Sequence, residues 1–349
     1  MKKINQIHII ENKKSLQNMD STDKFIFEED AKLMIESLKA FGSSLELLKN
    51  ITILQPSKYD ITLSTQNYFK NNNVKFIKKE LYNPQKEGIN KVTNYTVIPI
   101  GIDYLVNESN LFDNDSYVFY TDLDVIYLKD LHSLLESVQT AINKDKMICT
   151  LLPWKQTAEN FNGIFRFDYV FQILKQTKIP DQFIEHFKSN NLNTFVNTWF
   201  IYAHKDHIFF KEFKNLTFFI LANKDLILKQ YQNDYKNDEF DMLKDLENIA
   251  EELATSIIYE RYKCFIDIAD IFRNEVSFQE NECHTVNNLY GVTKDSRIYH
   301  YNSLEYFLNG FNTDIKSLPN FKKMTRLIIQ SIGMEDTMKY LNLTIKDLK

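Results

Sequence analysis

The sequence predicts an α/β protein with a mostly parallel sheet flanked by helices. Two observations predict this fold class. Short runs of β-forming residues alternate with amphipathic helical segments through the first half of the chain, as in proteins built from strand–helix–strand units. The run at 117–120 (YVFY) also lacks alternating polar residues, as expected for a strand covered on both faces. The 349 residues are enough for one large domain of this class.

In the first half, each predicted strand is rich in Ile, Val, Phe or Tyr, and the helices carry apolar residues at helical spacing. Leu33, Met34 and Leu38 form one such stripe, which ends at Gly42. Pro56 closes the strand predicted at 51–54. In chain order we expect strands at 4–10 and 25–28, a helix at 30–41, a strand at 51–54, a helix at 59–71, a strand at 74–77, a helix at 101–108 and a strand at 117–120, after which a second apolar run covers 125–128.

The second half alternates less regularly. Leu131, Leu135 and Val138 mark a helix, Pro153 closes the next strand, and the polar stretch 231–239 separates two helices. We expect helices at 131–143, 167–176, 181–189, 206–221 and 240–262, and strands at 147–152, 195–203, 264–268 and 297–301. Amphipathic segments over 314–349 predict a helical C-terminal extension, residues 313–349, packed on a domain that spans residues 1–312.

Charge and cysteine content narrow the function. A net charge of −5 argues against a nucleic-acid partner, which usually requires a basic face. Cys149, Cys264 and Cys283 are odd in number and far apart, which favours free thiols in a reducing compartment. The N-terminal apolar run is short and interrupted, and no apolar run approaches the ~18 residues of a membrane span. We therefore expect a cytoplasmic protein without a signal peptide or transmembrane segment.

An acidic pair follows the central strand directly. Asp122 and Asp124 come after the YVFY run, and open α/β sheets place their ligands at the carboxyl ends of such strands. At i, i+2 spacing both side chains point to one side of an extended backbone. One divalent cation could bridge both, or one carboxylate could bind the metal and the other a ligand hydroxyl. The alternative is a pair of solvated loop carboxylates without a function.

Residues 118–131 (VFYTDLDVIYLKDL) resemble the DXD segment of GT-A-fold glycosyltransferases that use nucleotide sugars, family eight and its relatives above all. Segment 25–42 is similar to the family's opening strand and helix, and segments 196–203, 250–256 and 298–302 are similar to later family segments in the same order, although Thr198-Trp199 stands where the family has Ser-Gly. The resemblance implies a Rossmann-like, mostly parallel mixed sheet. It also implies transfer of a sugar, UDP-hexose being favoured, to an unknown glycan, lipid or protein acceptor.

The resemblance also implies roles for particular residues. Mn²⁺ or Mg²⁺ would neutralise the diphosphate of the leaving nucleotide, because hard cations prefer carboxylate oxygens and Mn²⁺ also accepts imidazole. Asp124 would bind the metal directly, while Asp122 would hold the ribose or reach the metal through water. The remaining expected site residues are His300 for the metal, with His284 as a second choice, Asn197 for the donor sugar, Lys294 and Arg297 for the diphosphate, and Glu251 and Glu252 beside the acceptor.

Two other functions fit the same motif. Haloacid-dehalogenase-type phosphatases also place Asp-x-Asp after an apolar strand, with the first Asp as nucleophile and the second as acid/base. Their motif usually lies near the N-terminus and continues with Gly-Thr-Leu, whereas here Val125 and Ile126 follow after a long α/β segment. The other alternative is a non-catalytic protein of the same fold that only binds nucleotide sugars, which the Thr198-Trp199 replacement favours.

Overall fold

A computed structural model of the chain describes most of its N-terminal three quarters. The described residues are 3–10, 27–40, 45–56, 60–81, 94–140, 142–153, 164–234, 242–272, 276–278, 297–300 and 325–326. Of the predicted C-terminal extension only residues 325–326 are described, and the boundary at 312/313 lies outside these ranges. Within them, every helix is too short or too polar to cross a bilayer.

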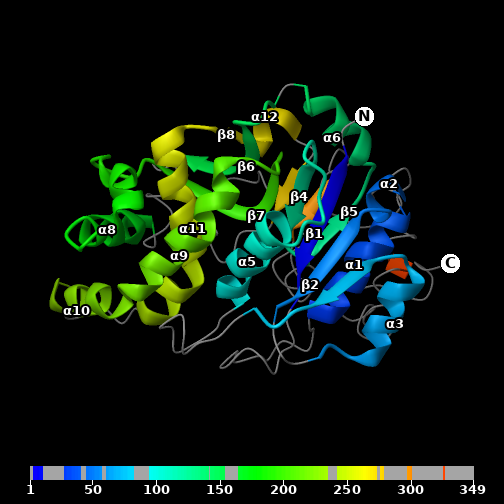
Figure 1. Ribbon diagram of the computed structural model, residues 1–349, viewed down its shortest axis with the longest axis horizontal. Helices are drawn as coiled ribbons and strands as arrows, with labels where there is room; N and C mark the ends of the chain where they lie inside the picture. The colour runs from blue at the N-terminus through cyan, green and yellow to red at the C-terminus, as the bar shows by residue number, and fades with distance from the viewer. Residues whose placement is uncertain are drawn as a thin grey trace.

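Seven strands of the described chain form one mixed, mostly parallel sheet in the order β3-β2-β1-β4-β7-β6-β8 (Figure 1). All neighbours pair in parallel except β7, which runs antiparallel to both β4 and β6. This sheet confirms the predicted fold class. Its strands are β1 (Ile4–Ile9), β2 (Ile51–Gln55), β3 (Lys75–Lys78), β4 (Tyr117–Thr121), β6 (Met147–Pro153), β7 (Thr194–His204) and β8 (Phe265–Asp267).

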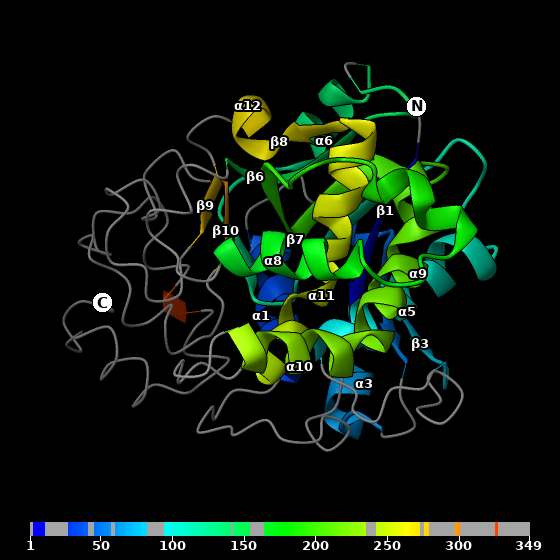
Figure 2. The same cartoon turned by 90° about the vertical axis from the view of Figure 1, so that its left-hand side faces the viewer.

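Helices cover both faces of this sheet (Figures 1 and 2). One face packs against α1 (Phe27–Ala40), α2 (Leu45–Leu48), α3 (Leu63–Asn71) and α6 (His132–Val138). The other packs against α5 (Asn94–Asp103), α8 (Ile164–Leu174), the 3₁₀ helix η2 (Asp181–Phe187), α9 (Ile208–Ala222), α10 (Lys224–Asp234) and α11 (Met242–Tyr262). A Cβ at Gly101 of α5 would clash with the Ile9 side chain, so the helix backbone lies close against β1.

Successive side chains of β4 are buried in the two apolar clusters on opposite faces of the sheet. Tyr117 and Phe119 are buried against α1 and its neighbours, whereas Val118 and Tyr120 are buried on the face of α11. Successive side chains of a strand point to opposite faces of the sheet, and here helices cover both faces. The unbroken YVFY run is therefore explained by burial on both sides.

A small second sheet joins the chain directly after the acidic pair. β5 (Val125–Tyr127) pairs antiparallel with β10 (Ile298–His300), which pairs in parallel with β9 (Val276–Phe278). β10 was predicted as a strand, and β5 lies in what was described only as an apolar run, whereas β9 and the short helix α12 (Ile268–Phe272) were not predicted. This sheet brings β10, more than a hundred residues later in sequence, to the residue that follows Asp124.

Several predicted boundaries were wrong. The strand predicted at 25–28 is wrong for Phe27 and Glu28, which begin α1. The predicted helix at 101–108 is α5 followed by a π-helical turn at Tyr104–Glu108. The helix predicted at 131–143 ends at Val138, and α10 occupies part of a stretch predicted to be a polar connection. The predicted free thiols are confirmed for Cys149 and Cys264, while Cys283 lies outside the described residues.

A tertiary contact explains the early start of α1. The Glu28 carboxylate, 3% exposed, accepts hydrogen bonds from the Thr62 backbone N–H (3.1 Å), the Thr62 hydroxyl (2.6 Å) and the Thr65 hydroxyl (2.5 Å) at the start of α3. Thr62 is the N-cap residue of α3. Glu28 therefore joins the first turns of two helices, and local β-propensity in FIFE is overridden.

We expect Glu28→Ala to lower the free energy of unfolding by about 2–4 kcal/mol, because buried hydroxyl and amide donors lose a charged acceptor. Urea unfolding followed by circular dichroism measures this. Glu46→Ala on α2 is the control, because the Glu46 carboxylate is exposed and pairs only with Lys49 on the surface. Equal effects of the two substitutions would contradict the assigned contact.

Candidate active site

The acidic pair lies where the order of the sheet reverses. From β1 the chain adds β2 and then β3 on one side, whereas β4 lies on the other side of β1. In open α/β sheets, ligands bind outside the carboxyl ends of the strands at such a switch point. Asp122 and Asp124 follow the carboxyl end of β4 at this position. The topology therefore supports the location predicted for the pair.

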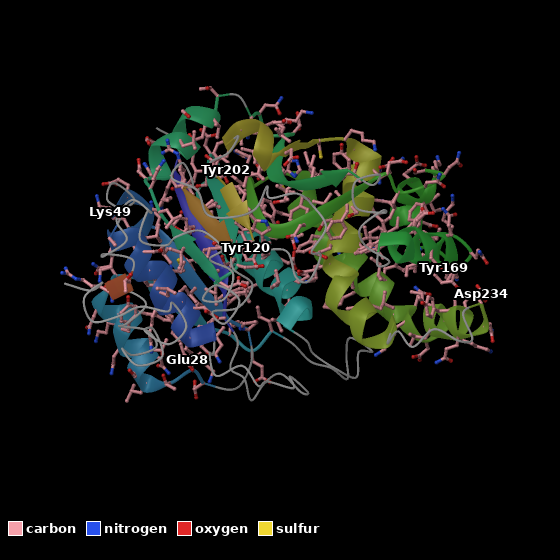
Figure 3. The ribbon with its side chains drawn as sticks, turned by 180° about the vertical axis from the view of Figure 1, so that it is seen from behind. Glu28, Lys49, Tyr120, Tyr169, Tyr202 and Asp234 are labelled. Atoms are coloured by element: carbon pink, nitrogen blue, oxygen red, sulfur yellow. The ribbon has the colours of Figure 1, made fainter. Side chains whose placement is uncertain are left out.

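Asp122 is held by two hydrogen bonds that fix its orientation. Its backbone N–H donates to the Trp199 carbonyl of β7 (2.9 Å), and its Oδ1 accepts from the Tyr120 hydroxyl (2.5 Å). Figure 3 shows Tyr120 in the middle of the molecule. Burial raises the pKa of Tyr120 well above its usual range, and the negative charges of Asp122, Glu251 and Asp124 raise it further. Three carboxylates from two distant segments thus act on one phenol.

Glu251 and Glu252 of α11 complete this acidic cluster. Glu251 is 4% exposed, and its Oε1 accepts from the Thr198 hydroxyl of β7 (3.2 Å). Its Oε2 is buried without a hydrogen-bond partner among the described residues. Burial, then Asp122 and Glu252, raise the pKa of Glu251 well above its usual range. Burial and Asp122 raise the pKa of Glu252 to about 8. The helix therefore brings two carboxyl groups to the acidic pair.

The structure does not place a complete metal-ligand set. Among the described side chains, no group of three His, Cys, Asp or Glu residues lies close enough to hold a metal ion. For His300 the structure describes the backbone, which pairs with Val125, the residue after Asp124. His300 thus lies beside the acidic loop in the register of the small sheet. Burial first, and then the charge of Asp122, raise the pKa values of Glu251 and Glu252, and a cation bound beside Asp122 would offset the second of these effects.

Of the other predicted site residues near the C-terminal end, the structure describes Arg297. The Arg297 carbonyl accepts from the Leu128 N–H (2.7 Å), and its Nη1 donates to the Asp130 carbonyl (2.7 Å), so this residue also supports the loop after β5. Lys294 and His284 lie outside the described residues. The contact of Arg297 and Lys294 with a diphosphate stays a prediction.

Asn197 and Thr198 lie at an irregularity of β7. The pairing of β7 with β6 shifts register between Ile148 and Thr150, and the Asn197 Oδ1 accepts from the Trp199 N–H (3.0 Å). This irregularity lies next to Asp122 and directs the Thr198 hydroxyl to α11. Bulged strands commonly re-aim side chains beside active sites. The Thr198-Trp199 pair therefore has a structural role of its own at the position where the family has Ser-Gly.

Tyr120 and Thr198 are site residues that the sequence analysis did not identify. Tyr120 lies two residues before Asp122, so the period of a strand could have placed both side chains on one face. The role of Thr198 depends on a contact across 53 positions of sequence. No local pattern indicates that contact.

No protein-family model matches the chain, and no curated protein matches it. Solved structures that superpose on it include the apo form of the bifunctional glycosyltransferase WbbM, at 10% identity and TM-score 0.47, over 98% of this chain and 52% of that one. The galactosyltransferase LgtC, in complex with donor and acceptor sugar analogues, follows at 9% identity and TM-score 0.44, over 96% and 99% of the two chains.

Mouse xyloside xylosyltransferase 1 in its apo form has 10% identity and TM-score 0.42, over 86% of this chain and 98% of that one. The chain therefore spans about half the length of WbbM. All three are glycosyltransferases, the class that residues 118–131 resemble. A likeness at these identities and scores carries no argument about function.

Because the pKa of Glu252 is raised, we expect the free energy of unfolding to depend on pH. The pKa of Glu252 is about 8 in the folded protein, against an ordinary value of 4.5. Below pH 4.5 the group is protonated in both states, and between pH 4.5 and 8 only the unfolded chain releases its proton. The free energy of unfolding therefore falls across this window as pH rises.

We expect Glu252→Gln to raise the free energy of unfolding of the ligand-free protein by about 3–5 kcal/mol above pH 8 and to change it little below pH 4.5. Urea unfolding at several pH values measures the difference. Glu260→Gln on the same helix is the control, because Glu260 pairs with Lys263 (2.6 Å) and its loss should not stabilise the protein. A gain for Glu252→Gln that is independent of pH would contradict the cluster.

Proposed function

We propose that this chain is a metal-dependent glycosyltransferase that moves a sugar, in the favoured case a hexose from UDP-hexose, to an acceptor hydroxyl. The observation that carries this proposal is the cluster of carboxylates from β4 and α11 at the switch point of the sheet. Burial first, and then the negative charge of Asp122, raise the pKa values of Glu251, Glu252 and Tyr120, so all three side chains lie within electrostatic reach of Asp122. Mutually repelling carboxylates at a ligand-binding edge favour a site for a cation.

Asp124, Asp122 and the neighbouring His300 are the residues that would hold Mn²⁺ or Mg²⁺. When bound, such a cation supplies Lewis-acid stabilisation of the diphosphate that leaves the sugar. The Tyr120 hydroxyl orients Asp122 by donating to its Oδ1, so one carboxylate oxygen is fixed before any ligand arrives. Pre-orientation of this kind reduces the entropy lost on binding. Asn197 would contact the donor sugar, and Arg297 with Lys294 the diphosphate.

The glutamates of α11 would act on the acceptor side. A general base works best when its pKa lies near the working pH, and burial beside Asp122 brings the pKa of Glu252 to about 8. In an inverting reaction one glutamate would take the proton from the acceptor hydroxyl. In a retaining reaction the same position would stabilise the sugar as its bond to the diphosphate breaks. Thr198 holds one oxygen of Glu251 and leaves the other, Oε2, for a ligand.

We expect Asp124→Ala to reduce Mn²⁺-dependent hydrolysis of UDP-glucose or UDP-galactose by more than about 100-fold, because the diphosphate loses a metal ligand. Release of UDP with and without Mn²⁺ measures this. Asp113→Asn, at an exposed carboxylate before β4, is the control and should keep the wild-type rate.

The same assay separates the proposed function from its two alternatives. Unchanged turnover in Asp124→Ala would contradict the proposal. Release of phosphate from a phosphomonoester by the wild-type protein would favour the phosphatase. Binding of the nucleotide sugar without turnover would favour the non-catalytic protein.

We expect Thr198→Val to shift the acidic limb of the pH profile of kcat/KM upward by about one pH unit. A hydroxyl that donates to a carboxylate favours its charged form, so losing the bond raises the pKa of Glu251 further. Thr198→Ser keeps the hydroxyl and should keep the profile. Identical profiles for the Val and Ser variants would show that Glu251 does not act as an ionised group in turnover.

A further inference from the structure

A network of buried polar side chains lies beneath the acidic loop, on the sheet face opposite to Tyr120. Each of its members is 0% exposed, and together they come from β1, α1, β4 and β5. The members are Gln6, His8, Ser37, Thr121 and Tyr127. Apolar side chains fill most neighbouring positions of these strands. Because buried polar groups cost stability unless they are bonded, this local concentration calls for an explanation.

His8 is locked in one neutral tautomer. Its Nδ1 lies 2.9 Å from the Thr121 carbonyl, which can only accept, so Nδ1 carries the hydrogen. Its Nε2 then accepts from the Gln6 Nε2 at 2.8 Å. Burial lowers the pKa of His8 to about 4, so the ring stays neutral at pH 7. The tautomer follows from this hydrogen-bond pattern.

The His8 ring replaces a backbone contact at the point where two strands separate. The ladder between β1 and β4 ends with the pair Ile7 and Tyr120. One residue further, the Thr121 carbonyl is bound by the His8 side chain. On the other edge of β4, the next peptide N–H, that of Asp122, donates to the Trp199 carbonyl. The backbone at the base of the acidic loop is therefore held from both sides.

The same network also holds the far end of the loop. The Gln6 Nε2 donates to the Tyr127 hydroxyl (2.9 Å) as well as to His8. These two bonds use both hydrogens of the Gln6 amide group. The Tyr127 N–H donates to the Ser37 hydroxyl (3.0 Å), which donates to the Met34 carbonyl of α1 (2.7 Å). Residues 122–126 thus run between two anchors that are joined through Gln6.

We infer that His8 is a positioning residue for the acidic pair: through the Thr121 carbonyl it sets the place from which Asp122 and Asp124 bind a divalent cation with a nucleoside diphosphate. This inference rests on the proposed function. His8 itself does not touch the ligand. Groups that orient metal ligands from behind typically contribute about 10–100-fold to metal affinity, so the effect of losing His8 is measurable.

A pair of amide substitutions tests the inference. Asn at position 8 can present an N–H near the place of Nδ1, whereas the longer Gln presents its amide near the place of Nε2, away from Thr121. The test titrates Mn²⁺ in the presence of UDP and follows free Mn²⁺ by electron paramagnetic resonance. We expect His8→Gln to weaken Mn²⁺ binding about 10–100-fold and His8→Asn to stay close to wild type.

His204→Gln is the matched control. His204 is also 0% exposed, but it lies at the other end of β7, where its Nδ1 accepts from the Asp206 N–H (3.2 Å). This variant should lose stability without losing Mn²⁺ affinity. All titrations are made at a temperature at which circular dichroism shows each variant folded.

The possible results separate this inference from the proposed function. If wild type binds Mn²⁺ with UDP and His8→Gln binds equally well, His8 is only structural and the inference is overturned alone. Equal losses in His8→Asn and His8→Gln, or an equal loss in His204→Gln, would show a general effect of destabilisation and overturn it too. If wild type binds no Mn²⁺ with UDP, both the inference and the proposed function fail.

Discussion

The proposed site depends on carboxyl groups that lie partly or wholly out of water and close to the charge of Asp122: Glu251 is buried, and Glu252 is half-buried. Asp122 comes from the end of β4, and Glu251 and Glu252 come from α11, yet each glutamate titrates under the influence of Asp122. Burial strengthens the repulsion from Asp122, because fewer water molecules screen the charges. Such an arrangement destabilises the ligand-free protein and is relieved when a cation binds. Residues that lower the folding stability are common at binding and catalytic sites.

The fold brings these groups together through one antiparallel strand. β7 pairs with β4 through Phe200–His204, and it also packs against α11. Its irregular segment lies beside Asp122 and presents the Thr198 hydroxyl to Glu251. The small sheet adds a second connection, since β10 carries His300 to the residue after Asp124. Four segments that are far apart in sequence, from β4, β7, α11 and β10, therefore meet at the switch point of the sheet.

Local patterns predicted the parts of this fold that depend on local physics. Short runs of β-forming residues and the apolar stripes of the helices located the main sheet, and the acidic pair does follow the end of a buried strand. Glu28 shows where such patterns fail. FIFE has strong β-propensity, but bonds from Glu28 to Thr62 and Thr65 make its end helical. The sequence could not show these bonds, because they join segments 34 and 37 positions apart.

Some residues of the candidate site could likewise be identified from the sequence, and others could not. Asp122 and Asp124 were identified because they directly follow a buried strand, whereas Glu251 and Glu252 were proposed because residues 250–256 resemble a family segment. Tyr120 and Thr198 were missed, since a buried Tyr in a strand is usually a core residue and a Thr in a strand usually has no catalytic neighbour. His8 was read only as part of a short strand, and its bond to the Thr121 carbonyl spans 113 positions. Contacts of this kind are decided by the tertiary fold.

Anomalous diffraction at the manganese absorption edge, from crystals of the protein grown with Mn²⁺ and UDP, tests the central claim most directly. The account predicts one strong peak within bonding distance of the Asp124 carboxylate, with density for a diphosphate on its far side. A peak bound elsewhere on the chain, or UDP bound with no manganese beside Asp122 and Asp124, would contradict it.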